Sequence, residues 1–210
     1  MTDQFYAKDG QFYLNGKPQF IQAGEFHYFR TSEDQWENRL NLLKQAGFNA
    51  VASYIPWRWH QVEEGTSDFD GHSHPMRNLA GFLDLAASMG LYVIARPGPY
   101  IMAETTHEGI PDWVFTHYPQ VAFISQDGKP QNVVSYLHPQ FLACVHQWYQ
   151  AVFQVLAPRQ ITRGGKIIMA QLDNEMGMIA WVRNIIDINP DTISRMASYL
   201  SEAYGQRLSV

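Results

Sequence analysis

The sequence has 210 residues, of which 46% are hydrophobic and 17% charged, and this balance excludes a disordered or fibrous chain. With a net charge of −5 and no apolar stretch of membrane-spanning length, we expect neither nucleic acid nor a membrane as a partner. The only cysteine, Cys144, excludes an internal disulfide framework, and the N-terminus lacks a signal-peptide pattern, so we expect a cytoplasmic protein.

Residues 1–19 are predicted to form short β-hairpin strands that lead into the main architecture. Asp9-Gly10 and Asn15-Gly16 separate short runs that are rich in aromatic residues, and both dipeptides favour tight hairpin turns. We treat these strands as the leading part of one domain that covers residues 1–210.

A pattern of one strand followed by one helix then repeats along the chain. Strands are predicted at 20–25, 50–55, 91–95 and 167–172. Helices are predicted to begin near Ser32, Pro75, Pro139 and Pro190, with Ser32 and Gln35 spaced as a capping box. Because nearly continuous apolar strands alternate with helices, the sequence predicts an α/β fold with a parallel sheet.

The connections between these elements favour a (β/α)8 TIM barrel. Connections from strand to helix are long and hold the unusual residues, above all 96–138, which is typical of a barrel whose active site lies at the carboxyl ends of its strands. A doubly wound sheet also alternates in this way, but it normally has a glycine-rich phosphate turn after an early strand. Since a closed barrel takes about 250 residues, we expect this chain to supply about the first four β/α units.

The most informative pair of residues, Asn174-Glu175, follows the fourth predicted strand. A glutamic acid at that place can protonate a departing glycosidic oxygen while the asparagine amide binds the sugar 2-hydroxyl. Alternatively, Glu175 caps a helix or pairs with an arginine, and Asp173 is a second candidate for the acid. Glu25 and Glu104 also follow strands; we expect Glu104 to bind sugar hydroxyls and Glu25 to be structural.

Several motifs extend this interpretation along the whole chain. In chain order they are Phe26-His27-Tyr28-Phe29-Arg30, Trp36 with Asn38-Arg39-Leu40, Tyr54, Gly90–Ile94, Arg96–Ile101, Ala103-Glu104, Pro111-Asp112-Trp113, Gly164–Ile168 and Gln171–Gly177. On these motifs the chain resembles glycoside hydrolase family 35, the β-galactosidase family, and corresponds to the N-terminal half of its catalytic domain. The resemblance implies a TIM barrel.

The resemblance also implies roles for individual residues. Glu175 matches the family's general acid/base, and Tyr54, Ala103, Glu104 and Asn174 match substrate-binding positions. The family is a retaining one, and its nucleophile emerges from a seventh strand, which would lie beyond residue 210. The implied activity is cleavage of terminal β-D-galactosyl residues from β-galactoside oligosaccharides, in carbohydrate metabolism, without metal or cofactor. Because the nucleophile is not in this chain, we expect residues 1–210 by themselves to be inactive.

The sequence departs from the family around the sugar rather than at the acid/base. Ile55–His60 replaces the usual run after the strand-two tyrosine, Met102 replaces a common cysteine, Glu108-Gly109-Ile110 replaces a Gly-Gly pair, and Asp173 stands where Glu is more usual. Two alternatives therefore stay open. One is a related barrel glycosidase acting on β-glucosides or β-mannosides; the other is a non-catalytic carbohydrate-binding fragment. A homo-oligomer also stays open.

For the remaining candidate residues, a structural role is at least as well supported as a functional one. About half of the aromatic residues that follow strands two and three are expected to touch ligand, and these are Trp57, Trp59, Tyr100 and Trp113. Trp36 and Trp148 are expected in the core or in packing between helices, and Cys144 as a buried thiol. The spacing of His60, His72, His74 and His107 matches no common metal motif, and Gly164-Gly165-Lys166 precedes a strand, which excludes a phosphate loop.

Overall fold

The computed structural model describes residues 3–178, 181 and 184–205. The leading strands form a three-stranded antiparallel sheet of β1 (Phe5–Lys8), β2 (Gln11–Leu14) and β3 (Lys17–Gln19). Both predicted turns are confirmed: Asp9 and Gly10 have φ of 50° and 74°, and Asn15 and Gly16 have φ of 50° and 78°. Two successive left-handed residues give the turn whose twist matches a hairpin.

A four-stranded parallel sheet is the centre of the fold, in the order β4-β5-β6-β9. Its strands are β4 (Ala23–Glu25), β5 (Ala50–Tyr54), β6 (Tyr92–Arg96) and β9 (Ile167–Ala170). Each strand lies beside the preceding strand of the same sheet, with Gly24 opposite Val51 and Ala95 opposite Ala170. This order confirms the predicted parallel α/β architecture. Within the described residues β4 and β9 are the edges of the sheet.

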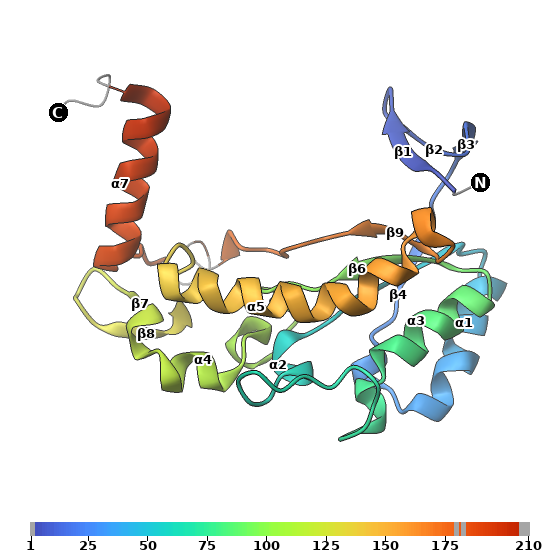
Figure 1. Ribbon diagram of the computed structural model, residues 1–210, viewed down its shortest axis with the longest axis horizontal. Helices are drawn as coiled ribbons and strands as arrows, with labels where there is room; N and C mark the ends of the chain where they lie inside the picture. Colours follow the sequence, from blue (N-terminus) through green and yellow to red (C-terminus); the bar gives the residue numbers. More distant parts are fainter. Residues whose placement is uncertain (1–2, 179–180, 182–183, 206–210) are drawn as a thin grey trace.

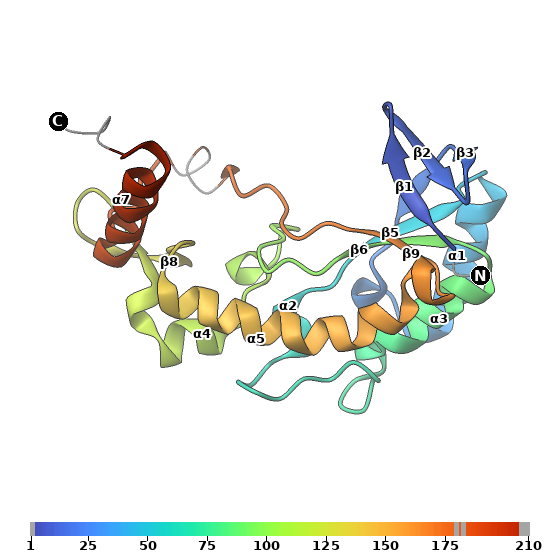
Figure 2. The same ribbon diagram turned by 45° about the horizontal axis from the view of Figure 1, so that its top comes forward.

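Helices cover one face of this sheet, as Figures 1 and 2 show. They are α1 (Trp36–Gln45), α3 (Leu79–Ser88) and α5 (Pro139–Leu156). The core between helices and sheet contains the fully buried Trp36, Phe82 and Trp148 together with Cys144. The predicted core positions of the two tryptophans and the cysteine are thus confirmed. A further helix, α7 (Pro190–Tyr204), projects away from the sheet (Figure 1).

Two helices begin later than the sequence indicates. Ser32 makes no capping hydrogen bond and is followed by a short 3₁₀ turn, Glu33–Gln35, so the predicted capping box is wrong and α1 begins at Trp36. The indole Nε1 of Trp36 donates to the carbonyl of Thr31 at 2.9 Å, which fixes the entry of the chain instead. Likewise Pro75 begins a 3₁₀ turn, Pro75–Arg77, and α3 is capped by Asn78.

The long connection after β6 has structure of its own. It contains a 3₁₀ turn (Thr106–Gly109), α4 (Asp112–His117), a second 3₁₀ turn (Pro119–Val121) and the antiparallel pair β7 (Ala122–Ile124) and β8 (Pro130–Val134). The shorter connection after β5 holds α2 (Trp57–His60), and single 3₁₀ turns occur at Tyr28–Arg30, Ala157–Arg159 and Ile161–Arg163. Among the described helices, none has the length and apolar character to cross a membrane.

Candidate active site

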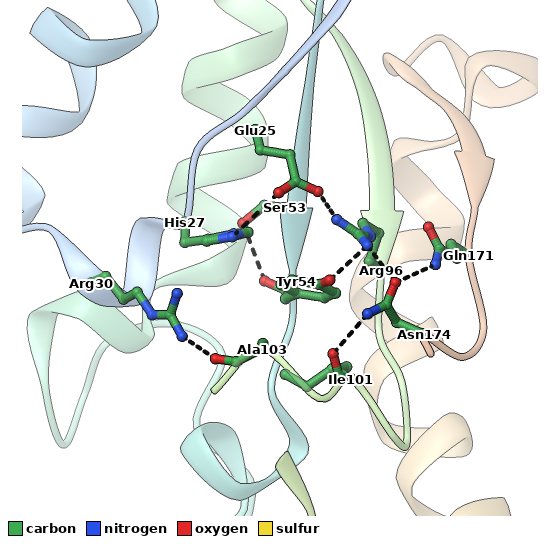
Figure 3. Close-up of polar contacts among 10 residues, drawn as sticks. All are labelled: Glu25, His27, Arg30, Ser53, Tyr54, Arg96, Ile101, Ala103, Gln171 and Asn174. Carbon is green, nitrogen blue, oxygen red and sulfur yellow. Dashed lines mark hydrogen bonds and ion pairs between the residues drawn. The ribbon is translucent and has the colours of Figure 1, made fainter. Parts of the chain in front are cut away.

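The parallel sheet brings polar residues from all four of its strands together at the carboxyl ends of those strands. Glu25 ends β4, Tyr54 ends β5 and Arg96 ends β6, while Asn174 follows the end of β9 at Ala170. The carboxyl ends of neighbouring parallel strands lie at the same edge, where ligands bind in α/β folds. Figure 3 shows these side chains converging on one point.

Arg96 occupies that point and is almost fully buried. Its Nη1 pairs with the carboxylate of Glu25, and its Nη2 donates to the Tyr54 hydroxyl at 2.7 Å and to Asn174 Oδ1 at 2.8 Å. The guanidinium carbon also lies 3.8 Å from the centroid of the Tyr54 ring. Burial lowers the pKa of Arg96, and the charge of Glu175 opposes that shift. In the sequence analysis Arg96 is named only as part of a motif and is given no role in the site. The signal that could have identified it is a positively charged residue at the end of an apolar strand.

The side-chain amide of Asn174 is fixed in orientation by its neighbours. Its Oδ1 accepts from Arg96 and, at 3.0 Å, from Gln171 Nε2, while its Nδ2 donates to the carbonyl of Ile101 at 3.1 Å. Its backbone N–H donates to the carbonyl of Tyr100 at 3.0 Å. The side chain of Asn174 also interacts with the Tyr54 hydroxyl, and this hydrogen bond opposes the rise that burial causes in the pKa of Tyr54.

Glu175 follows directly and is exposed, with a left-handed backbone at φ 58°. A non-glycine residue in this region is uncommon and is often found at functional sites. Its carboxylate lies within electrostatic range of the cluster, because it raises the pKa of Tyr54, second only to burial. Within the described part of the chain, Glu175 forms no ion pair with an arginine.

Asp173, the competing candidate for the acid, is held by two hydrogen bonds. Its Oδ2 accepts from the Tyr136 hydroxyl at 2.6 Å and its Oδ1 accepts from the backbone N–H of Tyr100 at 3.3 Å. Burial, reinforced by this carboxylate, raises the pKa of Tyr136 far above its usual range, so the hydroxyl stays a donor. Asp173 therefore ties the connection after β6 to the segment after β9.

The predicted substrate-binding residues Ala103 and Glu104 lie near the group formed by Glu25, Tyr54, Arg96 and Asn174. Met102, Ala103 and Glu104 have φ of 58°, 47° and 47°, so three successive residues that are not glycine have left-handed backbone. The carbonyl of buried Ala103 accepts a hydrogen bond from Arg30 Nη2, which holds this backbone in place (Figure 3). The exposed carboxylate of Glu104 contributes to the raised pKa of Tyr54, after burial and Glu175.

His27 also belongs to the candidate site, although in the sequence analysis it is named only as part of a motif. Its ring stacks on Tyr54 with centroids 4.9 Å apart, and its Nε2 lies 3.8 Å from Glu25 Oε2. Burial lowers the pKa of His27, and the nearby Arg30 lowers it further. Its Nδ1 is buried and has no hydrogen-bond partner among the described residues.

The aromatic residues after strands two and three divide between core and surface. Trp57, Tyr100 and Trp113 are buried in the core, where Trp57 stacks on Trp148 with centroids 6.0 Å apart. Trp59 is half-buried and lines a cavity. In the part of the chain that the structure describes, no three His, Cys, Asp or Glu side chains are grouped to hold a metal ion.

The sequence model of "Glycosyl hydrolases family 35" matches residues 11–203. An "Exo-beta-D-glucosaminidase" of Thermococcus kodakarensis is 42% identical over 170 residues, which are 79% of this chain and 22% of that protein. A "Beta-1,2-glucosyltransferase" of Ignavibacterium album is 39% identical over 196 residues (92% and 27%), and a "Beta-galactosidase" of Mus musculus is 35% identical over 172 residues (82% and 24%).

Among solved structures, the β-galactosidase from the psychrophilic Marinomonas ef1 has a TM-score of 0.66 at 14% identity, over 89% of this chain and 26% of that one. At this identity the likeness concerns the fold alone. The chain spans about a quarter of the length of the relatives it matches. With a family match over nearly all of its residues, the chain belongs to glycosyl hydrolase family 35.

Proposed function

We propose that residues 1–210 form the first four β/α units of a TIM-barrel catalytic domain, and that the complete domain is a retaining glycosidase. The strand order supports this, because β4, β5, β6 and β9 lie side by side in the order in which the chain forms them, as the strands of a barrel do. The length of the relatives also supports the proposal that the chain is part of a larger catalytic domain, since the matched region is about a quarter of each relative's length.

The observation that carries the proposal is the fixed Asn174 amide next to Glu175. Arg96 and Gln171 hold Oδ1 and the carbonyl of Ile101 accepts from Nδ2, so the amide has one orientation beside Glu175. That geometry suits a sugar 2-hydroxyl, whose hydrogen bond strengthens as the ring becomes oxocarbenium-like. Glu175 then lies beside the glycosidic bond.

In the proposed reaction Glu175 acts first as an acid and then as a base. Its carboxyl proton passes to the glycosidic oxygen while a second carboxylate, supplied by the seventh strand of the complete domain, attacks the anomeric carbon. The C–O bond to the aglycone breaks, the aglycone leaves as an alcohol, and a glycosyl-enzyme forms. Glu175, now ionised, takes a proton from water as that water displaces the enzyme carboxylate. A positioned acid/base of this kind contributes about 10²–10⁴ in rate.

We propose terminal β-galactosides as the substrate, on the family resemblance of Tyr54, Ala103, Glu104 and Asn174. A second candidate, a β-glucoside or β-glucosaminide, is favoured by the relatives at 39% and 42% identity, whose names refer to glucosyl and glucosaminyl chemistry. The β-mannoside alternative and the carbohydrate-binding alternative are outcomes of the same test.

The test compares aryl β-glycosides on the complete enzyme. The kcat/KM for β-galactoside is expected to exceed those for β-glucoside, β-glucosaminide and β-mannoside, and the first-formed sugar is expected to retain its anomeric configuration by NMR. A higher value for another sugar would replace the substrate but keep the reaction. Sugar binding with no turnover of any substrate would overturn the proposal.

A further inference from the structure

Three side chains of the short stretch 135–138 each contact an aspartate of the connection after β9. Ser135 Oγ donates to Asp187, the Tyr136 hydroxyl donates to Asp173 Oδ2 at 2.6 Å, and His138 Nε2 lies 3.1 Å from Asp191 Oδ2. The first of these aspartates in the chain precedes Glu175, and the other two follow it. The stretch between β8 and α5 therefore holds the chain on both sides of the proposed acid.

Tyr136 is a rigid donor, because the elements on both sides of it fix its place. It follows the buried Ser135 just after β8, and its ring packs edge-on against the fully buried Phe141 of α5, with centroids 5.4 Å apart. Burial, reinforced by the Asp173 carboxylate, raises the pKa of Tyr136 far above its usual range, so the hydroxyl keeps its proton. A donor that is packed in place and stays protonated holds its acceptor in one position.

Glu175 depends on its neighbours in the chain for its own position. Its φ of 58° is a left-handed conformation, which a residue other than glycine keeps only where the surrounding structure imposes it. Its carbonyl accepts from the Met178 N–H at 2.8 Å, and within the described part of the chain no side-chain hydrogen bond holds its carboxylate. The Asn174 side chain has partners of its own. Loss of the anchor at Asp173 would therefore displace Glu175 more than the Asn174 amide.

We propose that Tyr136 is a positioning residue of the reaction, which holds Glu175 at the glycosidic oxygen through its hydrogen bond to Asp173. The inference rests on the proposed function and deepens it, because it adds a residue that acts through a neighbour of the acid. It also gives Asp173 a role other than that of an acid, since its carboxylate is the acceptor by which the connection after β6 fixes the segment after β9.

The test removes the hydroxyl of Tyr136 and compares substrates of the complete enzyme. Tyr136→Phe should lower kcat/KM about tenfold for glycosides with poor leaving groups, since small misplacements of a reacting group cost up to about 10²-fold. Glycosides with activated leaving groups depart without a proton from Glu175, and their kcat/KM should stay nearly unchanged. For both classes KM should be retained, because the Asn174 amide keeps its own partners.

Tyr118→Phe is the matched control. Tyr118 lies on the same connection as Tyr136, and its hydroxyl donates to Glu64 Oε1 at 2.6 Å, a bond of the same kind and length to a carboxylate of the connection after β5. Any effect that comes from lost stability alone should appear in both variants, and urea midpoints measure that loss. We expect the control to keep full activity. Equal losses of activity in the two variants would refute the role of Tyr136.

Two further comparisons decide whether Tyr136 acts through Asp173 and Glu175. Asp173→Ala removes the acceptor and should give a loss similar to that of Tyr136→Phe, and the double variant should lose no more than the larger single loss. A far greater loss from Asp173→Ala would make Asp173 the acid and contradict the proposal. In Glu175→Gln enzyme, which has no acid to position, Tyr136→Phe should have no further effect, and an additional loss of about tenfold would contradict it as well.

The unsubstituted enzyme separates this inference from the proposed function. If it hydrolyses no glycoside, the proposed function fails and the role of Tyr136 fails with it. If it hydrolyses glycosides and Tyr136→Phe leaves the dependence on the leaving group unchanged, only the role of Tyr136 fails.

Discussion

Arg96 Nη2 donates a 2.8 Å hydrogen bond to the side-chain oxygen of Asn174 and so joins the end of β6 to the segment after β9. The same nitrogen donates to the Tyr54 hydroxyl at 2.7 Å, and Nη1 pairs with Glu25. One guanidinium group therefore fixes residues from the ends of all the strands of the parallel sheet. Its planar set of donors makes this possible, because Nη1 and Nη2 direct their hydrogens to partners that lie apart, whereas the three donors of an ammonium group all spread from a single nitrogen.

Replacing Arg96 tests this positioning role. Arg96→Lys is expected to lower kcat of the complete enzyme about 10²-fold, the size of effect that small misplacements of binding groups produce. Because the effect passes through Asn174 and the sugar 2-hydroxyl, the loss should be much smaller on a 2-deoxyglycoside. Arg159→Lys, at a surface pair with Asp84, is the control and should retain full kcat. Equal losses on the 2-hydroxy and 2-deoxy substrates would contradict the role.

Replacing Glu175 tests the proposed acid. Glu175→Gln should reduce kcat/KM about 10²–10⁴-fold on substrates with poor leaving groups, where protonation of the departing oxygen limits the rate. Activated aryl glycosides, whose leaving groups depart without a proton, should lose less. The check is a plot of kcat/KM against leaving-group pKa, which should steepen in the variant. An equal loss across the series would count against the role of Glu175 as acid.

Buried His60 is expected to make the stability of the fold pH-dependent. Its Nδ1–H donates to the carbonyl of Asp68 at 2.6 Å and its Nε2 accepts from the Tyr28 hydroxyl, an arrangement that suits neutral imidazole. Burial lowers the pKa of His60 from 6.5 to about 4. Below pH 6.5 the unfolded chain therefore takes up a proton that the folded chain refuses, so the folded state loses stability as pH falls.

The loss between pH 6.5 and 4 should be about 3 kcal/mol, since one pKa unit corresponds to about 1.4 kcal/mol. Urea midpoints of the complete enzyme, followed by tryptophan fluorescence, measure it. His60→Gln, which does not titrate but can still accept from Tyr28, should flatten this dependence. His146→Gln, at an exposed position of α5, should leave it unchanged. The same slope in both variants would show that His60 is not its source.

Exposed apolar side chains near the C-terminal end predict that the 210-residue chain by itself associates. Trp181 is 79% exposed and Ile186 65%, and α7 adds Met196 at 49% and Tyr199 at 64%. Surfaces of this kind mark packing or association sites. Light scattering should show species larger than a monomer, reduced by the paired change Met196→Glu and Tyr199→Glu. A monomer at micromolar concentration would refute the expectation.

Much of this architecture follows from local signals in the sequence. The Asp9-Gly10 and Asn15-Gly16 turns form as predicted because their residues tolerate left-handed backbone, whatever the rest of the chain does. The alternation of apolar strands and helices predicts the parallel sheet, and chain order then places Asn174 and Glu175 at its carboxyl edge. These features depend on residues that are neighbours in sequence.

The contacts that define the site depend on residues far apart in the chain, and only the tertiary structure decided them. Arg96 meets Glu25 and Asn174 because the strands align in one sheet, and Asp173 is held by Tyr136 because the connection after β6 reaches the segment that follows β9. The helix α1 begins at Trp36 and not at the predicted Ser32 for the same reason. The buried indole of Trp36 donates to two backbone carbonyls, and these contacts outweigh a local cap. Spacing along a chain carries local preferences, whereas the pairing of buried polar groups is fixed when the layers pack.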